Sequence, residues 1–82
     1  MNLLVLGGDG MLGHQLLHEW RERHHVAATF HQPMAAYDHV LDVTRVRTFG
    51  EVDAGDFARV RAIVHEVKPD AVINSIGIVK QR

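Results

Sequence analysis

The sequence contains no cysteine, which excludes disulfide bonds and metal sites built from thiolates. Charge of one sign is not in excess either, because 9 Lys and Arg residues oppose 10 Asp and Glu residues, for a net charge of -1. Such a balance gives no basic surface for nucleic acid or for an anionic membrane. The composition therefore predicts a chain without nucleic-acid or membrane partners, and it fits a reducing compartment.

Long apolar runs are missing as well. The first one, residues 3–6, leads directly into glycines and is too short for a signal peptide or a membrane span. With 82 residues the chain allows at most one small domain. We therefore predict a soluble, cytoplasmic protein with one small core.

The strands are predicted from short apolar segments. Residues 3–6 and 71–76 are continuous apolar runs, as expected of parallel strands that are covered on both faces. Residues 26–30 form another short strand, which Pro33 ends. Residues 49–52 add a further extended piece.

Helical spacing is found in residues 11–23 and in residues 57–67, and Pro69 ends the second of these helices. We expect the following apolar side chains to face the core: Leu12, Leu16, Leu17, Trp20, Phe57, Val60, Ile63, Val64 and Val67. Residues 34–48 leave two interpretations open, a loop with a short helix or an edge strand at residues 39–43.

The order of elements indicates the fold class. Strands that alternate with helices need crossover connections, which are almost always right-handed. We therefore predict an α/β fold, a Rossmann-type parallel sheet with flanking helices. The chain covers the N-terminal portion of such a fold only.

The glycines in residues 7–13 carry the strongest signal. Positions 7, 10 and 13 fit the spacing G-x-x-G-x-x-G, whereas positions 8, 10 and 13 fit G-x-G-x-x-G, so the pattern does not decide between them. Both have the same mechanism in a strand–turn–helix unit. The early glycine permits a tight turn, Gly10 lets the backbone approach a diphosphate, and Gly13 lets the helix pack closely on the sheet.

Anion binding at this turn follows from the helix that it opens. The backbone N–H groups near Gly10, Met11 and Leu12 would meet the diphosphate along the helix dipole. No Gly-Lys-Ser/Thr follows, which disfavours a P-loop. We therefore expect residues 1–82 to be a partial NAD(P)-binding Rossmann domain.

Three stretches resemble the extended short-chain dehydrogenase/reductases: Met1 to His14, Val52-Asp53-Ala54 and residues 67–81. Within them the chain is similar to the branch of dTDP-4-dehydrorhamnose reductase and related sugar-nucleotide reductases of surface polysaccharide synthesis. The resemblance implies an NAD(P)-dependent oxidoreductase. It also implies that the NAD(P) pyrophosphate is bound by Gly7, Gly10, Met11, Leu12 and Gly13.

The resemblance places further cofactor contacts at the ends of two strands. It implies that Asp53 and Ala54 contact the adenine, although Asp42-Val43 is a rival pair and Asp53 could instead be a helix cap. It also implies that Ser75, Ile76 and Gly77 pass the ribose and nicotinamide side of the cofactor.

The choice of cofactor depends on the end of the second predicted strand. NAD-preferring Rossmann proteins usually carry an acidic residue there, which binds the ribose hydroxyls, but this chain has Thr29-Phe30-His31-Gln32. The missing carboxylate leaves room for a 2′-phosphate, although no arginine lies nearby in the sequence. NADP(H) is therefore favoured over NAD(H), with His31 as a candidate cofactor residue.

Catalytic residues are not assigned. The family's Tyr-x-x-x-Lys pair lies beyond the fourth strand, whereas Tyr37 is the only tyrosine of this chain and is followed at the required distance by Leu41. We therefore expect binding of a dinucleotide, with a nucleotide-sugar substrate only in a full-length protein. The alternative is a non-catalytic Rossmann module that binds dinucleotide or self-associates through an exposed strand edge.

The 7 histidines do not form a recognisable metal motif. His14 and His18 have the spacing that places two imidazoles on one helix face, but Gln15 stands where a zinc-protease helix carries Glu. We therefore predict no metal site. His24 and His25 are expected to close the first helix, where positive charge suits the dipole.

Overall fold

The computed structural model describes residues 1–37, 43–53 and 55–75, which form four strands, two α-helices and one 3-10 helix. In chain order these are β1 (Asn2–Leu6), α1 (Met11–Trp20), β2 (His25–Thr29), η1 (Met34–Tyr37), β3 (Val46–Phe49), α2 (Phe57–Val67) and β4 (Ala71–Asn74). The strands form one parallel sheet in the order β3-β2-β1-β4. The predicted α/β Rossmann-type sheet is confirmed.

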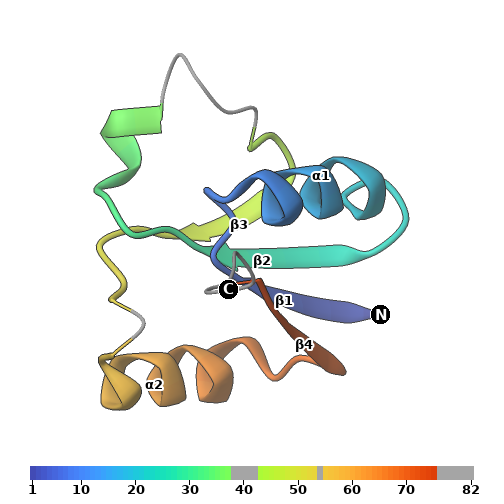
Figure 1. Cartoon of the computed structure of the whole chain (residues 1–82). Coiled ribbons are helices and arrows are strands. Elements are labelled where there is room, and N and C mark those ends of the chain that lie inside the picture. The colour runs from blue at the N-terminus through green and yellow to red at the C-terminus, as the bar shows by residue number, and fades with distance from the viewer. Residues whose placement is uncertain (38–42, 54, 76–82) are drawn as a thin grey trace, which may run out of the picture.

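The sheet separates two apolar layers, with α1 on one face and α2 on the other (Figure 1). Successive side chains of a strand point to opposite faces, so Val5 faces α1 while Leu4 faces α2. The core beside α1 consists of Val5, Leu17, Val26, Ala28 and Phe30. The core beside α2 consists of Leu4, Ala27, Val52 and Ile63. This burial on both faces explains why the central strands are continuously apolar.

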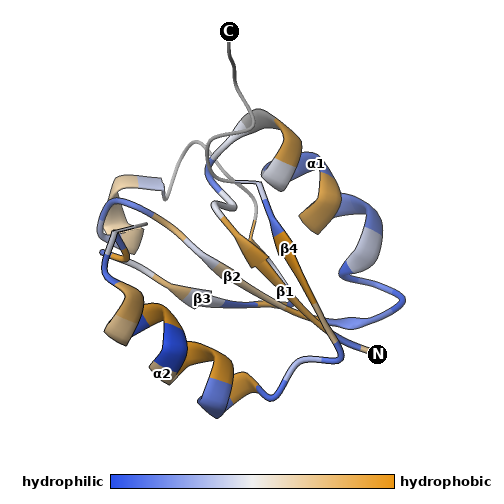
Figure 2. Ribbon diagram, turned by 60° about the horizontal axis from the view of Figure 1, so that its bottom comes forward, coloured by the Kyte–Doolittle hydropathy of each residue, from blue (hydrophilic) through white to orange (hydrophobic). Residues whose placement is uncertain are grey.

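Helix α2 is amphipathic, as Figure 2 shows by its alternating apolar and polar segments. Val60, Val64 and Val67 pack around the buried Ile63, as predicted. The predictions for Phe57 and for Leu12 of α1 were wrong, because these side chains are 74% and 43% exposed. Phe57 is the first residue of the helix, and Val52 from the preceding loop completes the core on that face instead.

Helix α1 ends at Trp20, three residues before the predicted end. The N–H groups of Arg23 and His24 both donate to Trp20 O, which closes the helix in a tight turn. His25 then begins β2 and pairs with Asn2 instead of closing the helix. The register of the sheet therefore overrides the helical propensity of these residues.

The predicted strand at residues 49–52 was wrong in its bounds, since β3 is Val46–Phe49. Glu51 has a φ of 57°, which an extended strand cannot contain. The alternative edge strand at residues 39–43 lies outside the described residues except for Val43. The other interpretation, a short helix in this region, is confirmed by η1.

No helix among the described residues is long and apolar enough to cross a membrane. β4 spans Ala71–Asn74, and the last described residue, Ser75, lies directly beyond it.

Candidate functional site

The carboxyl ends of β1 and β4 mark the candidate site. The connection from β1 leads to β2 on one side of β1, whereas the connection from β3 leads to β4 on the other side. Ligands of open α/β sheets bind at such a point, just outside the carboxyl ends of the strands. Here the residues at that point are Gly7, which follows β1, and Ser75, which follows β4.

The backbone of the turn requires two of the glycines. Gly7 has a φ of 86°, in the left-handed region that other residues avoid. At Gly13 a Cβ atom would lie 2.2 Å from Gly7 O and 2.8 Å from Ser75 Oγ, so α1 rests on the end of β1. The left-handed φ of Gly7 favours the spacing with positions 7, 10 and 13 over the one with positions 8, 10 and 13.

Thr29 holds the turn from the neighbouring strand, a role that the sequence analysis did not assign. Its side chain is buried, and its Oγ1 accepts a hydrogen bond from Gly7 N at 3.1 Å. Its carbonyl oxygen accepts another from Gly8 N at 2.8 Å. The only feature of the sequence that could have indicated this role is the hydroxyl group of Thr29 in the otherwise apolar segment of residues 26–30.

Ser75 ties the end of β4 to the same turn. Its Oγ lies 2.8 Å from Leu6 O and 2.9 Å from Gly7 O, and its N–H donates to Leu6 O. A hydroxyl has only one proton to share between the two carbonyl groups. The predicted site residues Gly7, Gly13 and Ser75 are thus in direct contact.

The N-terminus of α1 is open toward an anion. Gly10 is the N-cap and provides no side-chain hydrogen bond, and the first turn of the helix carries no acidic side chain. The first intrahelical bond runs from His14 N to Gly10 O, so the N–H groups of Met11, Leu12 and Gly13 precede it. This end of the helix has the free N–H groups and the positive dipole that favour anions, and the binding of a diphosphate here stays a prediction.

Of the adenine-side candidates, Asp53 follows β3 at the carboxyl end of the sheet. Asp53 is exposed, and its Oδ1 accepts a hydrogen bond from Gly55 N at 2.8 Å. The cap of α2 is Asp56, which accepts from Arg59 N, so the interpretation of Asp53 as the helix cap is wrong. Ala54 and the rival Asp42 lie outside the described residues, as do Ile76 and Gly77.

A polar network connects the glycine turn to the segment after β2. Asp9 Oδ2 accepts hydrogen bonds from His31 N at 3.2 Å and from Tyr37 OH at 2.8 Å. Tyr37 OH in turn accepts from Gln32 N at 3.0 Å, and its ring contacts Phe30. The sequence analysis did not predict this network, because Asp9 and Tyr37 are 28 positions apart and no local sequence pattern connects them.

Burial raises the pKa of the Tyr37 phenol above its ordinary value of 10.0. The N–H of Gln32 acts in the opposite direction, while the hydrogen bond to Asp9 and its negative charge raise the pKa further. The protonated phenol is the form that the network requires, since it must donate to Asp9. Tyr37 is therefore a neutral donor here.

A titration of Tyr37 tests this assignment. Because the sequence has one tyrosine, phenolate absorbance reports Tyr37 alone, and we expect its midpoint above pH 10.0 in the folded chain. Because the pKa of Tyr37 is raised in the folded chain, the native state keeps the phenol proton to a higher pH than the unfolded state does. The protonated phenol therefore stabilises the fold fully below pH 10.0, and this stabilisation is lost as the pH rises through the folded pKa. A Tyr37→Phe variant should lack this alkaline loss of stability, and a midpoint at or below 10.0 would contradict the assignment.

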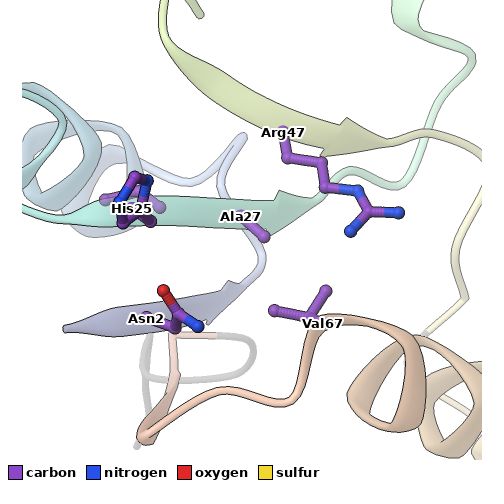
Figure 3. A pocket seen from close by; sticks show the side chains of 6 residues that line it. Asn2, His25, Ala27, Arg47 and Val67 are labelled. Atoms are coloured by element: carbon purple, nitrogen blue, oxygen red, sulfur yellow. The ribbon is translucent and has the colours of Figure 1, made fainter.

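A separate pocket opens at the other end of the sheet. It has a volume of 340 Å³ and is lined by Asn2, His25, Val26, Ala27, Arg47 and Val67 (Figure 3). Asn2 and His25 begin β1 and β2, so the pocket lies at the amino ends of the strands, opposite the glycine turn. Its cation Arg47 is paired with Glu66 of α2. The pocket is therefore distinct from the candidate site.

The histidines of α1 lie as their spacing predicted. The rings of His14 and His18 are 4.7 Å apart, edge to face. Within residues 1–37, 43–53 and 55–75 no group of three potential metal ligands is present.

Comparison with known proteins agrees with the geometry. A family model described as the RmlD substrate binding domain matches residues 1–77. A search of curated proteins and a search of solved structures returned no match. The matched family comprises sugar-nucleotide reductases that are in general NAD(P)-dependent. As the resemblance predicted, the chain therefore belongs to the RmlD family, the family of dTDP-4-dehydrorhamnose reductase-like proteins.

Proposed function

We propose that this chain is the NAD(P)-binding portion of a cytoplasmic sugar-nucleotide reductase that acts in surface polysaccharide biosynthesis. The observation that carries this proposal is the N-terminus of α1, which has no side-chain cap. Gly13 lies in close contact with Gly7, and this contact places the N-terminus of α1 at the ends of β1 and β4. Such a site supplies N–H donors and a positive dipole to a diphosphate.

Each predicted residue has a role in this proposal. The N–H groups of Met11, Leu12 and Gly13 bind the pyrophosphate, while Gly7 makes the turn and Gly10 leaves space for the ligand. Asp53 and Ala54 contact the adenine. Ser75, Ile76 and Gly77 lie along the ribose and nicotinamide side.

The cofactor supplies the hydride when it is bound, and this chain contributes binding and orientation. Protonation of a carbonyl oxygen needs an acid beside the substrate, and the family's Tyr-x-x-x-Lys pair does not occur in the sequence. We therefore expect the 82-residue chain to bind the dinucleotide without reducing a dTDP-4-keto sugar. The sequence favoured NADP(H) because residue 31 is His31, but the carboxylate of Asp9, which accepts a hydrogen bond from His31 N, argues against that preference.

Gly10→Ala tests the diphosphate site with little damage to the fold. A Cβ atom at Gly10 would meet only Gly7 O, at 3.6 Å, and the φ of -78° suits alanine. We expect the free energy of unfolding to fall by about 1 kcal/mol, the cost of a poorer N-cap. The methyl group would stand where the diphosphate approaches, so the affinity for NADH and NADPH should fall about tenfold or more in isothermal titration calorimetry.

Adenosine is the control ligand, because it lacks the diphosphate. Its affinity should be the same for the wild-type chain and for Gly10→Ala. Equal binding of NADH and NADPH by both proteins would show that the diphosphate lies elsewhere. If the wild-type chain binds neither dinucleotide, the proposed function is wrong.

A further inference from the structure

Residue 31 has no carboxylate, but the carboxylate of Asp9 lies beside it in the folded chain. In NAD-binding Rossmann units the acidic residue that follows the glycines by about 20 positions accepts hydrogen bonds from the adenosine ribose. His31 occupies that position here and has no carboxylate. The carboxylate of Asp9 lies against its backbone, where Oδ2 accepts from His31 N at 3.2 Å.

We propose that Asp9 provides this carboxylate from within the glycine turn and thereby selects NAD(H) over NADP(H). The inference rests on the proposed function, because it assigns a specificity residue to the same cofactor site.

The position of Asp9 is well defined by its partners. Tyr37 OH donates to Oδ2 at 2.8 Å, and Tyr37 is held in turn by Gln32 N and by ring contact with Phe30. Both hydrogen bonds engage the same oxygen. In the part of the chain that the structure describes, Oδ1 of Asp9 has no hydrogen-bond partner.

The chemistry of the carboxylate matches one cofactor and opposes the other. An ionised carboxylate only accepts hydrogen bonds, and the 2′- and 3′-hydroxyl groups of an NAD ribose can donate them. The 2′-phosphate of NADP has no such donor when ionised and brings further negative charge. Asp9 is half-buried, so solvent screens this repulsion only in part.

Among the described residues, Asp9 has no cationic partner that would offset this repulsion. Asp9 forms no salt bridge within residues 1–37, 43–53 and 55–75. Arg47 of the neighbouring β3 lines the pocket at the amino ends of the strands and pairs with Glu66. The sequence favoured NADP(H) because residue 31 has no carboxylate. In the structure Asp9, 22 positions earlier in the chain, places a carboxylate there.

Calorimetric titration of three proteins with NADH and NADPH tests the proposal. The wild-type chain should bind NADH about tenfold more tightly than NADPH. Asp9→Asn keeps an acceptor for His31 N but removes the charge, so the ratio should fall to about twofold or less. The matched control is Asp70→Asn, because Asp70 also accepts a backbone hydrogen bond, from Asn2 N at 2.7 Å, but lies at the opposite end of the sheet. It should keep the wild-type ratio.

A role of Asp9 in structure alone predicts a different result. If Asp9 only holds the segment after β2, Asp9→Asn should weaken NADH and NADPH by the same factor, and the proposal is then wrong. Tyr37→Phe should keep most of the preference, because the carboxylate stays beside His31 N. Loss of the preference in Tyr37→Phe but not in Asp9→Asn would also overturn the proposal.

A second measurement needs no variant. The wild-type chain should bind adenosine 5′-monophosphate more tightly than adenosine 2′,5′-bisphosphate, which adds only the 2′-phosphate. Equal affinities, or tighter binding of the bisphosphate, would overturn the selection by Asp9 while the proposed function stands. Failure to bind any of these adenine nucleotides, NADH and NADPH included, would remove the proposed function and this inference together.

Discussion

Gly13→Ala should remove a large part of the free energy of unfolding of the chain. The added Cβ atom would lie 2.2 Å from Gly7 O, a backbone atom that cannot turn aside as a side chain could. Either α1 or the end of β1 must move, which we expect to cost about 3 kcal/mol or more. A chain of 82 residues has a free energy of unfolding of only roughly 4–12 kcal/mol. Urea titration followed by far-ultraviolet circular dichroism measures the loss.

Gly10→Ala is the matched control for this prediction. It is the same substitution one turn earlier, but its Cβ atom would meet Gly7 O at 3.6 Å, which is ordinary contact. Its urea midpoint should fall only by the amount that a loss of about 1 kcal/mol causes, and should stay well above that of Gly13→Ala. If Gly13→Ala is as stable as Gly10→Ala, the close approach of α1 to β1 is not as described.

Phe30→Ala should have the second-largest effect, a loss of about 3–5 kcal/mol in the free energy of unfolding. The ring is 1% exposed and belongs to the core beside α1. It also supports the site, because it contacts Tyr37 and lies so close to Gly8 that a Cβ atom there would meet Phe30 Cζ at 3.0 Å. Chemical denaturation should show the loss, and dinucleotide binding should weaken with it.

Phe57→Ala is the control for Phe30→Ala. The same atoms are removed, but Phe57 is 74% exposed and leaves no cavity. We expect a change within about 0.5 kcal/mol, which is usual for surface positions. Equal losses for the two variants would mean that Phe57 is buried after all.

The glycine turn shows how much of the site could be predicted from sequence. Its spacing alone indicated that a strand, a tight turn and a helix follow one another, because each glycine answers a local backbone requirement. The same local reasoning identified α2 and its end, where Lys68 adopts a left-handed conformation before Pro69. Such signals act over one or two turns of chain, which is why they can be read without the fold.

Predictions failed where neighbours in space, rather than in sequence, decide the structure. Arg21 to Arg23 could continue a helix, but the pairing of His25 with Asn2 ends it earlier. β3 is placed by its register with β2, in which Thr29 is opposite Phe49. The exposure of Phe57 was missed for the same reason. Helical spacing predicts which side of α2 faces the sheet, but it does not predict how much of the helix the sheet covers.

By itself, therefore, the sequence determined the α/β class, the glycine turn and the family, because these depend on local spacing and on continuous motifs. Only the tertiary structure decided which glycines make the turn and what lies at the end of β2. Asp9, His31 and Tyr37 meet across 22 and 28 positions of the chain, and Ser75 reaches Gly7 across 68. Parallel strands bring such residues to one edge of the sheet, and contacts of that length leave no local signal in the sequence.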